Sequence, residues 1–219
     1  MASKRHEEAA PIMKSYVIRQ GDYLAKIALR FGIAADEIWK HPKNHELRAK
    51  RKPNLLVPGD VLFVPEPARP ALPFQCGTTN RYKADVPKVP VRLTFHVGGK
   101  AIASEPYEVE GLGAPQTGES DASGKVTLQV PAHVREVRVR FTKKGMVFPI
   151  MIGDMEPIDE PSGVRKRLEH LGYMQGLEMF DADRRLKLAL ASFQRATGLH
   201  VSEEADEATK EALVSAHGS

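Results

Sequence analysis

Apolar and polar positions along the first third of the chain describe a strand, a helical stretch and a second strand. After the first strand, four apolar residues recur at helical spacing and share one helix face: Leu24, Ile27, Ala28 and Phe31. Asp22 precedes this face and is predicted to cap the helix by accepting hydrogen bonds from its free backbone N–H groups. A proline–glycine turn at 58–59 then leads into a short apolar strand that ends at Pro65.

Apolar spacing changes from helical to alternating after about residue 88. Three sets of alternating residues indicate half-buried strands: Val91, Leu93, Phe95 and Val97; Val126, Leu128 and Val130; and Val137, Val139 and Phe141. Tyr107 and Val109 suggest a further strand. Polar, glycine-containing turns separate these segments. Short alternating strands at this spacing predict a small antiparallel β-sandwich over 88–150.

Helical spacing returns in the last quarter of the chain. The first predicted helix is capped by Ser162 and ends at Gly172, where a left-handed residue is expected. The second covers 183–196, and the third covers 207–216 with Asp206 as its cap. Their inward positions are predicted from the spacing alone: Val164, Leu168, Leu171, Leu186, Ala189, Leu190, Phe193, Ala208, Ala212 and Leu213.

Two proline-rich segments separate these regions. The segment 68–87 is predicted to be a stiff connector, because proline fixes its backbone angle and donates no hydrogen bond. Phe74, Cys76 and Tyr82 could let part of it pack on a neighbour. The segment 151–161 is acidic as well as proline-rich, and we expect it to be solvated and extended.

Composition is that of a soluble globular protein, with 42% hydrophobic and 27% charged residues among 219. The formal net charge of +4 favours anionic polymers, including cell-wall material, without requiring them. Aromatic residues make up only 6% and no nucleic-acid-binding signature accompanies the basic residues, so nucleic acid is not an expected partner. No apolar stretch approaches the roughly 18 residues of a membrane span.

Catalytic and metal-binding constellations are not apparent in the sequence. Cys76 is the only cysteine, lies far from any histidine along the chain, and is expected to be a half-buried packing thiol. His41 and His45 are four residues apart, but Pro42 makes a continuous helix through them unfavourable. We therefore predict no enzyme, no metal site and no cofactor.

The first eleven residues lack the apolar core of a secretory signal, and a single cysteine forms no internal disulfide. We therefore expect cytoplasmic synthesis without a signal peptide. Later delivery to the periplasm or cell wall by a non-classical route stays open.

Residues 15–67 resemble a LysM module. The resemblance rests on the segment from Tyr16 to Ala28 and on the segment from Val57 to Pro65, which occur in family order. It implies a βααβ fold that binds N-acetylglucosamine-containing glycans such as peptidoglycan, with the sugar between the loop after the first strand and the loop before the last. Tyr23 departs from the Thr or Ser usual in the family, and the basic run 40–53 is longer than usual.

The resemblance implies glycan binding by the turn residues Gly21, Asp22, Tyr23 and Leu24, and Trp39 and Asn44 are further candidate glycan contacts. Trp39 could equally belong to the core or stack on a sugar ring. The enlarged loop adds three candidate anion contacts, Lys50, Arg51 and Lys52, which could also be simply solvated.

Two further resemblances concern the rest of the chain. The run from Gly118 to Pro131 looks like the turn of transthyretin-like and carboxypeptidase-regulatory-like β-domains, which are scaffolds or adhesion units. Residues 162–216 resemble the three-helix peptidoglycan-binding domain found beside cell-wall hydrolases. The resemblance rests on Leu171-Gly172-Tyr173, Phe193-Gln194 and Asp206 to Leu213, and Tyr173, Phe193 and Gln194 could be glycan contacts or structural residues.

The sequence thus predicts a multi-domain α+β protein: a LysM-like module (15–67), a small antiparallel β-sandwich (88–150) and a three-helix C-terminal domain (162–216). The predicted function is non-catalytic binding of bacterial peptidoglycan through two glycan-binding modules. The alternative is an adaptor of a contractile injection apparatus, of the type VI secretion or phage-tail kind, that binds spike, baseplate or effector proteins.

Overall fold

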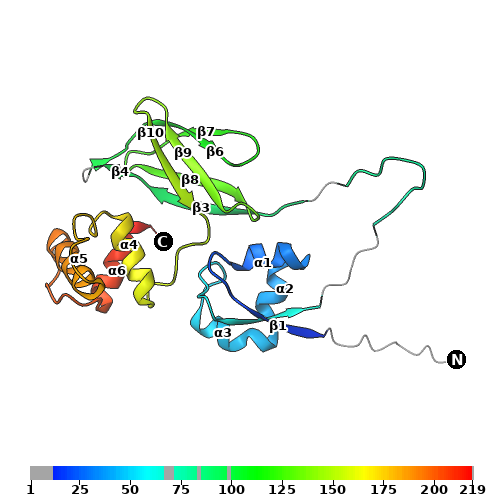
Figure 1. Cartoon of the computed structure of the whole chain (residues 1–219), viewed down its shortest axis with the longest axis horizontal. Coiled ribbons are helices and arrows are strands. Elements are labelled where there is room, and N and C mark those ends of the chain that lie inside the picture. The colour runs from blue at the N-terminus through cyan, green and yellow to red at the C-terminus, as the bar shows by residue number, and fades with distance from the viewer. Residues whose placement is uncertain (1–11, 67–71, 83–84, 98–99, 219) are drawn as a thin grey trace. The chain divides into compact units, whose positions relative to one another are not determined.

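A computed structural model describes residues 12–66, 72–82, 85–97 and 100–218. The chain divides into two compact units, Met1–Pro87 and Lys88–Ser219, which are described separately (Figure 1). The boundaries of the three predicted domains stay a prediction. Within the described ranges, no helix is both long enough and apolar enough to cross a bilayer.

The first unit pairs two antiparallel strands and carries four short helical segments between them. These elements are β1 (Met13–Val17), α1 (Leu24–Phe31), α2 (Ala35–Lys40), the 3₁₀ helix η1 (Pro42–Asn44), α3 (His45–Lys50) and β2 (Val61–Pro65). Tyr16 lies opposite Leu62 in the strand pair. The basic run 40–53, predicted to be an enlarged loop, is therefore mostly helical. As expected, Pro42 ends α2 and prevents one helix from joining His41 to His45.

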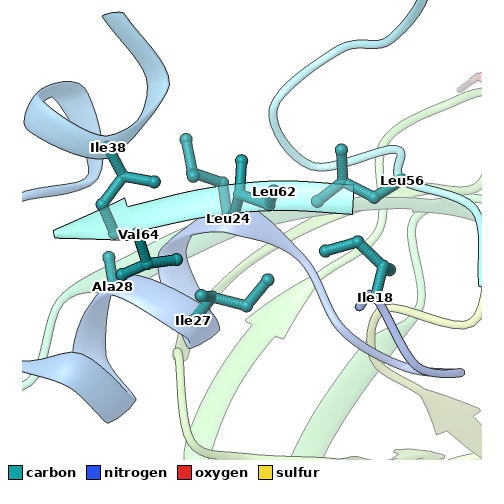
Figure 2. Packing of buried hydrophobic residues seen from close by; sticks show 8 residues of the cluster. All are labelled: Ile18, Leu24, Ile27, Ala28, Ile38, Leu56, Leu62 and Val64. Carbon is teal, nitrogen blue, oxygen red and sulfur yellow. The ribbon is translucent and has the colours of Figure 1, made fainter. Parts of the chain in front are cut away.

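The core of this unit contains the predicted helix face. Figure 2 shows its buried side chains, which come from α1, α2, β2 and the loops beside the strands: Ile18, Leu24, Ile27, Ala28, Ile38, Leu56, Leu62 and Val64. Phe31 and Trp39 pack at the margin of this cluster. Burying an aliphatic side chain of this size stabilises the fold by about 1.5–3 kcal/mol, so the core holds both strands and helices in place.

The second unit begins with antiparallel strands. They are β3 (Lys88–Thr94), β4 (His96–Val97), β5 (Lys100–Ala101), β6 (Pro106–Glu110), β7 (Gln116–Glu119), β8 (Lys125–Pro131), β9 (Glu136–Phe141) and β10 (Met146–Met151). Four of them form a sheet in the order β10-β9-β6-β7, while β3 pairs with β8 and β4 with β5. The alternation predicted for β8 and β9 is confirmed, because every second residue is buried.

Aromatic contacts join the β3–β8 pair to the larger sheet. The ring of Phe95, directly after β3, lies 5.1 Å from the rings of both Phe141 and Phe148. Val97, predicted to face inward with Phe95, is exposed instead and belongs to the separate β4–β5 pair. The sequence pattern missed β10, which contains Pro149; an edge strand tolerates this residue, since its outer side needs no backbone donor.

Three helices complete the second unit: α4 (Pro161–His170), α5 (Ala182–Thr197) and α6 (Glu207–His217). Asp206 caps α6 as predicted, accepting a hydrogen bond from the Thr209 N–H at 2.8 Å, and Gly172 has the expected positive φ of 85°. Ser162 does not cap α4; it lies inside the helix and donates to the Glu156 carboxylate. Ala208 was predicted to face inward but is exposed, and Thr209 occupies the buried position.

The acidic segment before α4 is docked against the helix, contrary to the prediction of a solvated linker. Glu156 is only 8% exposed, and its backbone oxygen accepts a hydrogen bond from buried Arg167 at 2.9 Å. Gly163 lets this happen, because a Cβ there would overlap the carbonyl oxygen of Pro157. Close approach of two backbones thus requires glycine at this position.

The described part of the first linker is exposed at all three positions expected to pack. Phe74, Cys76 and Tyr82 are accessible to solvent, so the prediction of a half-buried thiol is wrong. The Tyr82 hydroxyl donates to the Pro73 carbonyl at 2.7 Å, which closes a local loop. Tyr82 thus contributes to local loop structure rather than to a core.

Candidate functional site

Two glycine–aspartate turns with the same hydrogen bonds flank the strand pair of the first unit. In the turn after β1, the Asp22 carboxylate accepts from the Arg19 N–H at 3.1 Å; in the turn before β2, the Asp60 carboxylate accepts from the Val57 N–H at 3.0 Å. The intervening glycines, at positions 21 and 59, have φ of 78° and 98°. Positive φ at the third residue is typical of type II turns, which explains glycine before each aspartate.

Each aspartate also meets an arginine. Asp60 accepts from Arg51 at 2.9 Å, and Asp22 lies 3.5 Å from Arg30 while accepting from the Tyr16 hydroxyl at 2.6 Å. Arg30 also donates to that hydroxyl. Asp22 was predicted to cap α1, but Tyr23 holds the cap position and α1 has no side-chain cap. The Asp22 carboxylate therefore stabilises the turn and does not cap the helix.

Backbone hydrogen bonds join the two turns into one surface. The Ile18 N–H donates to the Asp60 carbonyl, and the Ile18 carbonyl accepts from the Gly59 N–H, both at 2.9 Å. The Leu24 N–H donates to the Pro53 carbonyl at 3.0 Å. The loop after the first strand and the segment before the last strand are thus adjacent. Exposed residues from both sides border this junction: Arg19, Gln20, Lys52, Pro53 and Asn54.

Three of the four predicted glycan contacts in the first turn have buried side chains. Asp22, Tyr23 and Leu24 are each at most 5% exposed, and only Gly21 is partly accessible. Burial raises the pKa of the Tyr23 hydroxyl to about 12. These side chains shape the turn and support it from below. A ligand on this surface would meet the backbone near Gly21 and the exposed neighbours of the buried residues.

The other two predicted contacts in this unit are held by the core and by backbone. Trp39 is partly buried against the core cluster. Asn44 is 1% exposed, and its side chain donates to the carbonyls of Ile38 and Phe63 and accepts from the Phe63 N–H, at 2.7–2.8 Å. Asn44 thus ties η1 to β2 and does not face solvent.

The basic run contains two kinds of residue. Lys50 and Lys52 are exposed, whereas Arg51 is committed to Asp60 and largely shielded. A cation that the sequence reasoning missed lies nearby: the Lys26 ammonium donates to the Gly21 carbonyl at 2.6 Å. Gly21 lies outside α1, so helical spacing does not link it to Lys26, and no sequence pattern indicated this contact.

The glycan contacts predicted in the C-terminal helices pack within the fold. Phe193 and Gln194 are buried, and Tyr173 packs edge-on against Phe193 with ring centroids 5.3 Å apart. The Gln194 side chain accepts from the N–H groups of Ser202 and Glu203 at 3.1 Å each. It also donates to the Glu204 carbonyl at 3.0 Å. Gln194 therefore fixes the loop between α5 and α6.

The described side chains offer no metal-binding geometry. Among the residues that the structure describes, no three histidine, cysteine or acidic side chains gather in a metal-binding group. The exposed Cys76 lies in the loop closed by Tyr82.

Comparison with known proteins identifies one domain. Residues 16–65 match the LysM domain, and this segment contains both glycine–aspartate turns and the junction between them. A LysM domain is a binding domain for peptidoglycan and related glycans and is typically non-catalytic. No curated protein and no solved structure matched this chain.

Proposed function

We propose that this protein is a non-catalytic peptidoglycan-binding protein whose glycan site lies across the junction of the two glycine–aspartate turns. The observation that supports this most is the coincidence of the LysM match with that junction. A glycan chain laid there would contact the backbone around Gly21 on one side and the segment Lys52 to Asn54 on the other. Rigid turns favour such binding, because little conformational entropy is lost when the ligand is bound.

Charge at the edge of the junction would add to this binding. Lys50 and Lys52 are exposed and have no ion pair within the described ranges. Peptidoglycan carries peptide carboxylates, which these ammonium groups can meet. Exposed pairs of this kind contribute at most about 1 kcal/mol each and weaken as salt rises. Arg51 is not part of this contribution, because Asp60 already neutralises it.

The experiment is co-sedimentation of the full chain with purified sacculi at low and high salt. We expect the protein to pellet at both, and Lys50→Gln/Lys52→Gln to weaken binding several-fold at low salt and less at high salt. The charge-matched control is Lys100→Gln/Lys143→Gln, which removes two exposed lysines of the second unit. Full recovery of wild-type protein in the supernatant at both salt concentrations rejects the proposal.

A second glycan-binding module in the C-terminal helices stays a prediction. Its predicted contacts Phe193 and Gln194 are buried, so the glycan proposal places no contact on their side chains. A role as an adaptor for protein partners, including those of a contractile injection apparatus, is the second candidate function. This second function is favoured by an open groove among the C-terminal helices. The groove is apolar and acidic, whereas the candidate site of the first unit is bordered by basic residues.

A further inference from the structure

An open groove of about 430 Å³ lies among the C-terminal helices, bordered by the start of α4, one face of α5 and the loop before α6. Its floor is apolar and is formed by Pro161, Val164, Leu186, Leu190 and Ala205. Leu190 and Val164 belong to the buried core, while Leu186 packs at its margin. The groove therefore presents the edge of a hydrophobic core to solvent.

The rim of this groove is acidic and largely uncompensated. Asp183, Glu203 and Glu204 line it, and within the described part of the chain none of their carboxylates has an ion pair. Lys210 also lines it, but its ammonium lies 3.5 Å from Asp159 and 3.9 Å from Glu207. Lys187 lines the rim as well, and it has no ion pair among the residues that the structure describes. The rim thus carries excess negative charge on a chain whose net charge is +4.

Hydrogen bonds from a buried side chain hold part of the acidic rim in place. Gln194 on α5 is fully buried and bonds the backbone of Ser202, Glu203 and Glu204. These hydrogen bonds fix the backbone that carries two of the rim carboxylates. A preformed rim is suited to binding, because a partner need not order it.

A second, smaller groove of about 280 Å³ shares Lys210 with the first. It is lined by Ile158, Glu207, Lys210, Glu211, Val214 and Ser215 and follows the outer face of α6. It repeats the same combination of apolar side chains and carboxylates. Together, the two grooves form one surface that can bind more than one side chain of a partner.

We propose that this surface binds a basic amphipathic peptide segment of a protein partner. Leucine- or valine-sized side chains of the partner would contact the floor, and its lysines or arginines would meet Asp183, Glu203 and Glu204. Helix-in-groove recognition combines an apolar seam with charges at the sides in this way. An acidic wall polymer or a free peptide carboxylate suits this rim poorly, since like charges repel.

The test uses the full chain and a fluorescent synthetic peptide of about 14 residues, with leucine and lysine in amphipathic helical order. One control peptide replaces lysine by glutamate, and another replaces leucine by serine. The groove variant is Asp183→Asn/Glu203→Gln/Glu204→Gln. The matched control variant is Glu108→Gln/Glu119→Gln/Glu136→Gln, which removes three acids from the strands.

We expect the groove variant to weaken binding of the leucine–lysine peptide by about ten-fold or more at low salt, and the control variant to change it by less than about two-fold. Both control peptides should bind more weakly. Equal losses in the two variants, or equal binding of the serine peptide, overturn the proposal. So does displacement of the peptide by a soluble muropeptide, or self-association of the free chain through this groove.

Circular dichroism at 222 nm establishes that the groove variant is folded, and Glu204→Gln alone replaces it if it is not. The inference is independent of the proposed glycan site. Sacculus binding tests the first unit and this peptide titration tests the second, so either can fail while the other stands.

Discussion

The guanidinium of Arg51 lies 2.9 Å from the carboxylate of Asp60, and both side chains are mostly shielded from solvent. The two flanking lysines, Lys50 and Lys52, are exposed. Three adjacent basic residues thus have different roles. Arg51 fastens the end of α3 to the turn before β2, whereas its neighbours remain available to a ligand.

Arg51→Ala should destabilise the first unit, because the Asp60 carboxylate would lose a charged donor while staying largely buried. A cost of about 1.5–3 kcal/mol in the free energy of unfolding is expected. Lys50→Ala is the control and should stay within about 0.5 kcal/mol of the wild type. Trp39 is the only tryptophan and packs on this core, so its fluorescence in a urea titration reports this unit. Equal stability of the two variants would contradict the account.

Gln194→Ala should destabilise the C-terminal helices. The change leaves the partly buried N–H groups of Ser202 and Glu203 without their acceptor and removes the donor to the buried Thr209 hydroxyl, and we expect a total loss of about 1–3 kcal/mol in the free energy of unfolding. Thermal unfolding followed at 222 nm measures the loss. Arg195→Ala, at the exposed next position of α5, is the control and should be near neutral. A small effect at Gln194 would show that water replaces its hydrogen bonds.

Gly163→Ala should release the segment that docks on α4. The added methyl group would overlap the Pro157 carbonyl, and we expect a loss of at least about 2 kcal/mol. Gly176→Ala is the matched control, since its Cβ meets nothing within 4 Å and only the positive φ is penalised. Limited proteolysis should cut near 152–160 in Gly163→Ala and spare the wild type. Rapid cleavage of the wild type there would instead support the solvated linker predicted from sequence.

Acid should weaken the C-terminal helices through His217. Its Nε2 lies 2.9 Å from Nδ1 of His170, and burial, helped by His170 and Arg167, lowers the pKa of His217 to about 4. The unfolded chain, with an ordinary histidine pKa near 6.5, then binds more protons between these values. Stability should therefore fall as pH drops from 6.5 towards 4, by on the order of 1–2 kcal/mol after allowance for solvent screening.

The control for this pH effect is His217→Gln, which cannot titrate. Thermal midpoints measured from pH 7 to pH 4 should show a shallower slope for this variant. The lowered pKa of Asp206 acts at lower pH, below its ordinary value of 3.8, so the two effects separate. Parallel slopes for wild type and variant would exclude His217 as the cause.

Local features of the fold were predictable from sequence. The buried face of α1 and the αL position of Gly172 depend on residues a few positions apart, and both were placed correctly. The role of Asp22 was not predictable in the same way. An aspartate before a helix can cap the helix or stabilise the preceding turn. Here the contacts with Tyr16 and Arg30 hold the Asp22 carboxylate in the turn.

The sequence predicts that the loop after the first strand and the segment before the last strand lie side by side, but it does not predict which side chains there are already paired. The junction of the two turns lies where the LysM resemblance puts it, yet Asn44 and Arg51 are occupied by partners 19 and 9 residues away along the chain. Such long-range pairing leaves no trace in local spacing. The acidic groove was also missed, because its rim draws on α5 and on the loop that Gln194 holds.

The most direct test of the glycan site is a ¹H–¹⁵N chemical-shift titration of the full chain with N-acetylglucosamine oligomers and soluble muropeptides. The account predicts that the shifted amides cluster at 19–24 and 51–54, on both sides of the Leu24–Pro53 hydrogen bond. Amides of the second unit should stay unchanged. Shifts confined to the second unit, or none at saturating ligand, would contradict the assignment of glycan binding to this junction.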